Sequence, residues 1–133
     1  MSQENVEIVR RGYAHRQATG DFLEEILASD FVWDMSSFRG WPEQQLYVGL
    51  DEARTFIASW MDAFKNWSIE IEALHDAGGK VVAVVRQRGT AKSNGLPVEM
   101  LLAQVYTIED GLETRMEMYA DPDEALKAAG LAE

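Results

Sequence analysis

Side chains capable of catalytic chemistry are sparse in this sequence of 133 residues. The chain has no cysteine, which excludes disulfides, a thiolate nucleophile and a cysteine-ligated zinc site. Its two histidines, His15 and His75, lie far apart in the sequence and no cluster of carboxylates accompanies them, so we expect no metal site. No serine lies in a nucleophile-elbow motif, and no phosphate-binding loop is present. The sequence therefore predicts neither a metal centre nor another cofactor.

Bulky apolar side chains, by contrast, are abundant and are suited to lining an irregular cavity. Aromatic residues gather in the first half of the chain: Tyr13, Phe31, Trp33, Phe38, Trp41, Phe56, Trp60 and Phe64. Four methionines, at positions 35, 100, 116 and 118, add adaptable apolar groups. Any one of these side chains is more simply explained by core packing. Together they predict a pocket for a small hydrophobic molecule, with Gln104 and Arg86 as the polar groups that orient it.

Hydrophobic spacing predicts the elements that must position these side chains in the first half. Val6, Val9, Tyr13 and Gln17 fall on one face of a helix that begins at a Ser2 cap and ends at Thr19-Gly20. A short second helix is expected from Asp21 to Leu27, followed by a strand over 31–36 with alternating polarity. Residues 37–45 are expected to form a loop, residues 46–48 a short strand, and residues 51–65 an amphipathic helix.

The second half has the pattern of an antiparallel meander. Strands are expected over 67–75, 80–91, 97–108 and 112–120, separated by three turn sequences, and a closing helix over 123–129 is ended by Gly130. Strand alternation assigns these residues to the pocket side: Val84 and Arg86, then Met100, Leu102, Gln104 and Tyr106, then Met116 and Met118. Helices followed by strands predict one α+β domain over residues 1–133. Because the outer sheet face is also apolar, we expect a homodimer through that face.

Several segments carry a resemblance to a known family. They are Asp-Phe-Val-Trp-Asp-Met at 30–35, Gly-Leu-Asp-Glu-Ala-Arg at 49–54, Asp-Ala-Gly-Gly-Lys followed by Val-Val-Ala-Val-Val-Arg at 76–86, Val-Tyr-Thr-Ile-Glu-Asp-Gly at 105–111 and Arg-Met-Glu-Met-Tyr-Ala-Asp-Pro-Asp-Glu-Ala-Leu at 115–126. The chain resembles the SnoaL-like branch of the nuclear transport factor 2-like superfamily, which includes ketosteroid isomerase. The resemblance implies a cone-shaped, curved antiparallel sheet wrapped around N-terminal helices, with a short C-terminal helix. It implies no single activity, because such proteins include isomerases, dehydratases, epoxide hydrolases, polyketide cyclases and non-catalytic binding modules.

The resemblance also suggests catalytic candidates. Tyr13 occupies the position of the isomerase's oxyanion-hole tyrosine, and Gln104 that of its protonated aspartic acid. The position of the general base holds Met35, whose thioether cannot abstract a proton. Asp34 is adjacent, but in a regular strand it points to the opposite face. Arg86 paired with Asp34 is the candidate for activating water, or for an ion pair that only closes the pocket wall.

Charge narrows the classes of partner. The chain has 12 basic and 23 acidic residues, a formal net charge of −11, which disfavours nucleic acid and anionic membranes. No apolar run has the length of a membrane span and no signal peptide is evident, so we expect a cytoplasmic protein. Three hypotheses remain: a small-molecule-binding protein with weak general acid–base or lyase-type chemistry, a hydrolase or cyclase acting on an apolar cyclic substrate, and a non-catalytic dimeric assembly module.

Overall fold

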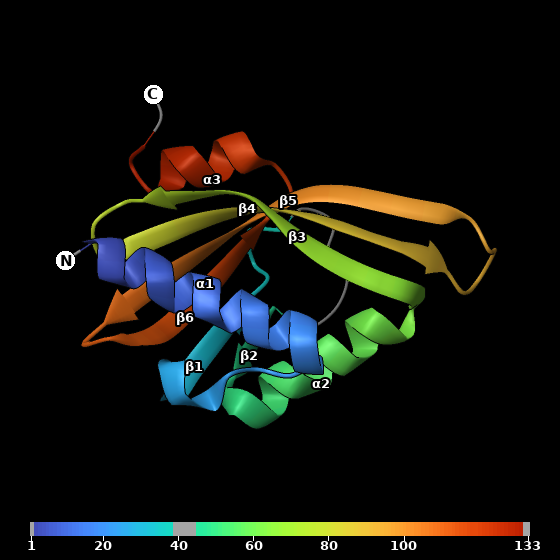
Figure 1. Cartoon of the computed structure of the whole chain (residues 1–133), viewed down its shortest axis with the longest axis horizontal. Helices are drawn as coiled ribbons and strands as arrows, with labels where there is room; N and C mark the ends of the chain where they lie inside the picture. The colour runs from blue at the N-terminus through green and yellow to red at the C-terminus, as the bar shows by residue number, and fades with distance from the viewer. Residues whose placement is uncertain (1, 39–44, 132–133) are drawn as a thin grey trace.

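A computed structural model of the chain describes residues 2–38 and 45–131. Its elements in chain order are α1 (Ser2–Thr19), the 3₁₀ helix η1 (Glu24–Ile26), β1 (Leu27–Asp34), β2 (Leu46–Val48), α2 (Gly49–Asp62), β3 (Phe64–Asp76), β4 (Lys80–Ala91), β5 (Pro97–Glu109), β6 (Leu112–Tyr119) and α3 (Pro122–Ala128) (Figure 1). The α+β class and the helices-then-strands order are confirmed. No helix in the described part of the chain is long and apolar enough to cross a membrane.

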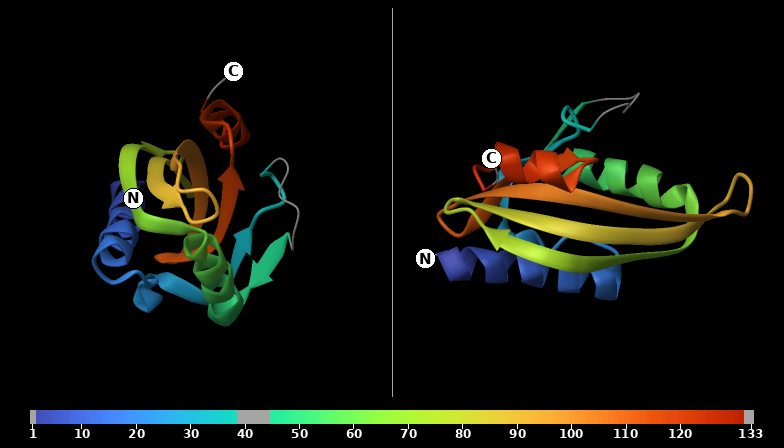
Figure 2. Two further views of the ribbon diagram at one scale, coloured as in Figure 1. Left: turned by 90° about the vertical axis from the view of Figure 1, so that its right-hand side faces the viewer. Right: turned by 90° about the horizontal axis from the view of Figure 1, so that it is seen from above.

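The six strands form one curved sheet in the order β2-β1-β6-β5-β4-β3. Helices α1 and α2 lie on its concave side and α3 on the opposite side (Figure 2). One pair corrects the expectation of a wholly antiparallel sheet, because β1 runs parallel to β6. No hairpin joins these two strands. The two strands begin at the same end of the sheet, since Leu27 near the start of β1 pairs with Glu113 near the start of β6.

The helices predicted over 21–27 and 51–65 are both shorter at their C-terminal ends, and the strands that follow them begin earlier than predicted. The short helix expected from Asp21 shrinks to the single turn of η1, because the chain already pairs with β6 from Leu27 through an irregularity before Val32. The third predicted helix ends at Asp62, since the next residues pair with the end of β4 as part of β3. Asn66 lies in the left-handed region, with a φ of 55°, at the irregularity where β3 is out of register with β4. Asparagine adopts this backbone conformation more readily than most residues.

The two sheet faces bury different sets of residues. Val9, Phe31 and Trp33 belong to the main core on the concave side, where α1 packs as its hydrophobic spacing predicts. On the convex side, α3 covers a smaller cluster that includes Val82 and Val105. Beyond α3 the convex side carries ion pairs, in which Arg86 contacts Glu72 and Glu99 and Arg88 contacts Glu70 and Glu99. Much of the face expected to be bare is therefore covered or charged, and the homodimer remains a prediction.

Gly89 of β4 occupies a position where the neighbouring strand approaches closely. A β-carbon there would lie 3.2 Å from Cβ of Phe64 and 3.3 Å from the backbone oxygen of Lys65. These atoms belong to the segment of β3 next to Asn66, so backbone and packed ring must both shift to accept a larger side chain.

We therefore expect Gly89→Val to lower the free energy of unfolding by about 1–3 kcal/mol through overpacking. Urea denaturation followed by circular dichroism measures the change. Gly79→Val serves as the control, because a β-carbon at Gly79 meets no atom within 4 Å. Equal losses of stability in the two variants would contradict the close approach at Gly89.

Candidate functional site

A cavity of about 370 Å³ lies between the end of α1, the C-terminal half of α2 and the concave face of the sheet. Its walls come from four parts of the chain and are mostly apolar. The lining residues are Arg16, Gln17, Ala18, Thr19 and Gly20 from α1 and its end, Phe56, Ile57, Trp60 and Met61 from α2, Trp67, Ser68 and Ile69 from β3, and Trp33, Gln87, Gln104 and Met118 from the other strands. None of these residues is an aspartate, a glutamate or a histidine.

Aromatic rings in mutual contact form one wall of the cavity. The ring centroids of Trp33 and Phe56 are 5.2 Å apart, and those of Phe56 and Trp60 are 5.7 Å apart. Trp67 meets Trp60 edge-on at 6.3 Å. Such contacts between neighbouring rings hold each ring in place, so the wall keeps its shape without a ligand. Sequence reasoning missed Trp67, although it begins a predicted strand and is one of only four tryptophans.

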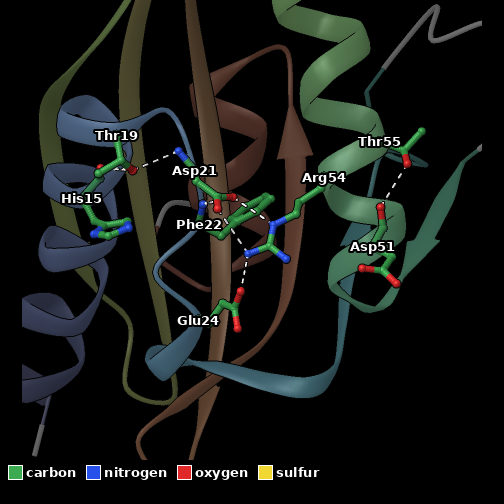
Figure 3. Close-up of polar contacts among 8 residues, drawn as sticks. All are labelled: His15, Thr19, Asp21, Phe22, Glu24, Asp51, Arg54 and Thr55. Carbon is green, nitrogen blue, oxygen red and sulfur yellow. Dashed lines mark hydrogen bonds and ion pairs between the residues drawn. The ribbon is translucent and has the colours of Figure 1, made fainter.

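A salt bridge fixes the segment beside the cavity mouth. Arg54 of α2 points toward Asp21 and Glu24, and the distance between Arg54 Nε and Asp21 Oδ1 is 2.9 Å (Figure 3). The backbone nitrogen of Asp21 also donates to the Thr19 hydroxyl at 3.1 Å (Figure 3). The segment after α1 is thus tied to α2. Beside it lies a second hollow of about 330 Å³, which shares Arg16, Gly20, Ile57 and Met61 with the main cavity.

Tyr13, Gln104 and Tyr106 form a buried polar network at the inner end of the cavity. The Tyr13 hydroxyl donates to Gln104 Oε1, and the Tyr106 hydroxyl lies 3.1 Å from the same oxygen and 3.2 Å from the Tyr13 oxygen. Burial raises the pKa of Tyr106 to about 12 and holds the pKa of Tyr13 well above its ordinary value. Both hydroxyls therefore remain neutral donors near pH 7. The structure brings Tyr13 and Gln104 together, while their suggested catalytic roles remain predictions.

Arg86 does not reach the cavity, in contrast to its expected placement. Directly opposite residues in an antiparallel pair point to the same face, and Arg86 is opposite Leu101, whereas Gln87 is opposite Met100. The concave face of β4 is therefore formed by Val81, Ala83, Val85 and Gln87. Val84 shares the convex face with Arg86, so its expected pocket placement is also wrong. Sequence alternation separates the two faces of a strand correctly but does not say which one turns inward.

Asp34 also lies away from the cavity. Its side chain is 4% exposed, accepts a hydrogen bond from the Ser36 nitrogen at 2.8 Å and pairs with Arg115. Burial alone would raise the pKa of Asp34, but the hydrogen bonds from Ser36 and the Arg115 guanidinium outweigh it and lower that pKa. The regular strand keeps Asp34 on the face opposite Trp33 and Met35. An Arg86–Asp34 pair is absent from the described structure, because each side chain pairs elsewhere.

The remaining predicted lining residues divide into three groups. Trp33, Phe56, Trp60, Gln104 and Met118 line the cavity. Phe31, Met35, Leu102, Tyr106 and Met116 are buried in the main core, and Phe38 and Met100 pack against that core, while Phe64 stacks on Trp67. Trp41 lies outside the described residues. No group of three or more histidine, aspartate or glutamate side chains gathers within residues 2–38 and 45–131 to hold a metal.

Glu113 is a buried carboxyl that sequence reasoning missed. It is 4% exposed and lines a small cavity of about 20 Å³ behind Tyr13, together with Tyr106 and Arg16. Met116 and Met118 point inward, so regular alternation along β6 would turn residue 114 inward and residue 113 outward. A register irregularity between Thr107 and Ile108 instead pairs Glu113 with Ile108, and Glu113 points inward. Burial raises the pKa of Glu113 to about 8, and the positive charge of Arg16 acts against that rise.

This pKa makes a pH-dependent contribution to stability. The folded state retains the Glu113 proton up to about pH 8, whereas the unfolded chain releases it near 4.5, so the free energy of unfolding falls as pH rises between these values. We expect Glu113→Gln to flatten this decline and to be more stable than the original protein at pH 8. Urea denaturation at pH 5 and pH 8 measures both effects. The control Glu109→Gln alters an exposed carboxyl at the end of β5 and should leave the decline unchanged.

Both the sequence and the fold are similar to those of known proteins. The profile of the SnoaL-like domain matches residues 9–116. Among solved structures, a protein of Jannaschia sp. assigned as a SnoaL-like polyketide cyclase shares 21% identity with a TM-score of 0.74, over 99% of this chain and 94% of its own. TerC co-crystallised with polyporic acid shares 18% identity with a TM-score of 0.74, over 96% and 98% of the two chains.

A third similar structure is a protein of Catenulispora acidiphila with a ketosteroid isomerase-like fold, in complex with trimethylamine. It shares 19% identity with a TM-score of 0.71, over 94% of this chain and 93% of its own. At these identities the likeness concerns the fold alone. A search of curated proteins found no match to the sequence.

Proposed function

Because this chain belongs to the SnoaL-like family, we propose that it binds one small, hydrophobic, cyclic molecule in the cavity between α1, α2 and the sheet. The observation that carries the proposal is the cavity itself. Its volume of about 370 Å³ falls at the small end of the range for ligand pockets, which is roughly 300–1,000 Å³. A well-packed domain of this size would otherwise contain few voids larger than a water molecule.

The chemistry of the walls supports a cyclic ligand. Trp33, Phe56, Trp60 and Trp67 offer flat surfaces for ring stacking, and Met61 and Met118 offer flexible groups that adapt to an irregular outline. Two of the similar proteins are consistent with this proposal, since one is assigned as a polyketide cyclase and another was crystallised with polyporic acid.

The enzyme alternative is less well supported by the geometry. Proton abstraction requires a base within hydrogen-bond reach of the ligand. Asp34 and Arg86, the charged residues suggested for that chemistry, lie outside the cavity, and no carboxylate or histidine lines it. A non-catalytic assembly module would not require an open cavity between the helices and the sheet. Binding is therefore the function that the cavity favours.

Filling the cavity tests this proposal. We expect Ala18→Trp, at the cavity wall, to weaken binding of 2-naphthalenemethanol by about tenfold or more, because the new ring occupies the ligand's space. Ala14→Trp is the matched control, since Ala14 is an exposed alanine one turn earlier in α1 and does not line the cavity. Equilibrium dialysis measures both affinities.

A second blocking variant approaches from the opposite wall. Ser68→Trp in β3 is expected to weaken binding to a similar degree. Native mass spectrometry of the freshly purified protein adds an independent readout, because a co-purified hydrophobic compound should be retained by the Ala14→Trp variant and lost from the two blocked variants. No binding to the original protein, or equal binding by all three variants, would refute the proposal.

A further inference from the structure

We propose that the cavity selects cyclic ligands that carry an anionic oxygen group, bound by Arg16, the Trp33 indole N–H and the side-chain amides of Gln87 and Gln104. This inference rests on the proposed function and adds the polar chemistry of the ligand. It follows from a count of hydrogen-bond donors and acceptors in the cavity wall.

The polar acceptors of the wall are already used within the protein. The Gln104 carbonyl oxygen accepts from Tyr13 and lies within hydrogen-bond distance of Tyr106. The Gln87 carbonyl oxygen accepts from Trp60 Nε1 at 3.2 Å. Because an indole N–H can only donate, this bond fixes the orientation of the Gln87 amide. Each glutamine therefore presents its NH₂ group as the remaining polar group.

Those NH₂ groups have little else to bind. The amide nitrogen of Gln104 reaches only the Met118 sulfur, at 3.6 Å, and thioether sulfur is a weak acceptor. Both glutamines line the cavity and are almost completely buried, with exposures of 3% for Gln87 and 1% for Gln104. A ligand oxygen would satisfy these donors.

Trp33 adds an unpaired donor. Its side chain is 1% exposed and lines the cavity, and its Nε1 has no hydrogen-bond partner within the described part of the chain. Buried donors without a partner are rare in folded proteins because their desolvation is not compensated. A hydrogen-bond acceptor inside the cavity would remove this penalty.

Arg16 supplies positive charge at the same place. Its guanidinium carbon lies 5.4–5.6 Å from the centroids of the Tyr13, Phe22 and Trp33 rings, and it lines the cavity. No carboxylate forms an ion pair with Arg16 among residues 2–38 and 45–131, although its side chain interacts with the Tyr106 hydroxyl. The nearby Glu113 carboxyl is protonated at neutral pH, since burial raises its pKa to about 8. The cavity is thus cationic and rich in donors.

The rest of the molecule favours the opposite selectivity. A formal net charge of −11 attracts cations and repels anions at long range. A preference for anions would therefore have to arise from groups within the cavity. Higher salt, which screens the distant charges more than the close contacts, should increase that preference.

Three probes with one ring system test the inference: 2-naphthoate, 2-naphthalenemethanol and 2-naphthylmethylammonium. At pH 7, equilibrium dialysis should show that naphthoate binds at least about tenfold more tightly than the ammonium compound, as expected for charge-assisted hydrogen bonds in a partly desolvated site. Arg16→Gln should remove most of this preference, and it should weaken naphthoate binding about tenfold more than it weakens alcohol binding. Arg10→Gln is the matched control, an exposed arginine on the same helix that pairs with Glu7 outside the cavity.

Trp33→Phe keeps an aromatic ring in the wall but removes the indole N–H together with part of the ring surface. It should weaken naphthoate binding by about threefold to tenfold, in line with the loss of one hydrogen bond to a charged group. The alcohol is the reference for both variants, because its affinity records any loss of ring contact or of folding, and the readout is therefore the ratio of naphthoate affinity to alcohol affinity.

The outcomes separate the two proposals. If the alcohol binds in the original protein but the ammonium compound equals or exceeds naphthoate, the anion preference is wrong and the proposed function stands. The same conclusion follows if the preference survives in Arg16→Gln. If none of the three probes binds, the proposed function fails and this inference fails with it.

Discussion

The pairing register of β4 with β5 is the constraint on which the cavity depends. It sets Val85 opposite Leu102 and Gln87 opposite Met100. Because side chains alternate across a strand, a shift of one residue would turn Arg86 inward and expel Gln87. The observed register has a physical basis: on the convex side Arg86 and Arg88 find acidic partners on both adjacent strands, whereas none of the residues that line the cavity is a carboxylate.

The same alternation separates the chain's charges from its cavity. The partners of Arg86 and Asp34 are on the convex side or at its edge, so the two pairs stabilise the sheet from outside. The cavity keeps neutral amides, hydroxyls and indoles, with Arg16 as the charged group among its lining residues. Neutral donors held by packing lose little entropy when they bind a ligand, which suits recognition more than proton transfer.

Burial changes the chemistry of the few ionisable groups near the cavity. Glu113 reaches the interior through a local register irregularity, and burial raises its pKa to about 8. Tyr13 and Tyr106 remain protonated for the same reason. As a result Arg16 lies near groups that are neutral at pH 7, and its charge is available to a ligand. The polar network, the protonated carboxyl and the Arg16 guanidinium are thus parts of one arrangement.

Much of the fold follows from local patterns in the sequence. The spacing of Val6, Val9 and Tyr13 predicted the face on which α1 packs, and the turn sequences predicted the meander, because helix and strand periods are local properties of the chain. Motifs along the chain were sufficient to identify the family. The aromatic excess predicted a cavity lined by Trp33, Phe56 and Trp60.

Features that depend on pairing between distant segments were decided only by the tertiary structure. The parallel contact of β1 with β6, the inward face of β4 and the inward turn of Glu113 each depend on which residues lie opposite one another. Alternating polarity along a strand shows which residues share a face, but it does not show which of the two faces is turned toward the core. The same is true of the hydrogen-bond donors in the cavity. The amide groups of Gln87 and Gln104 are left as donors only because their oxygens accept from Trp60 and Tyr13, which are far away in the sequence. Sequence therefore determined that this chain would enclose an aromatic cavity, and tertiary pairing determined which polar groups face into it.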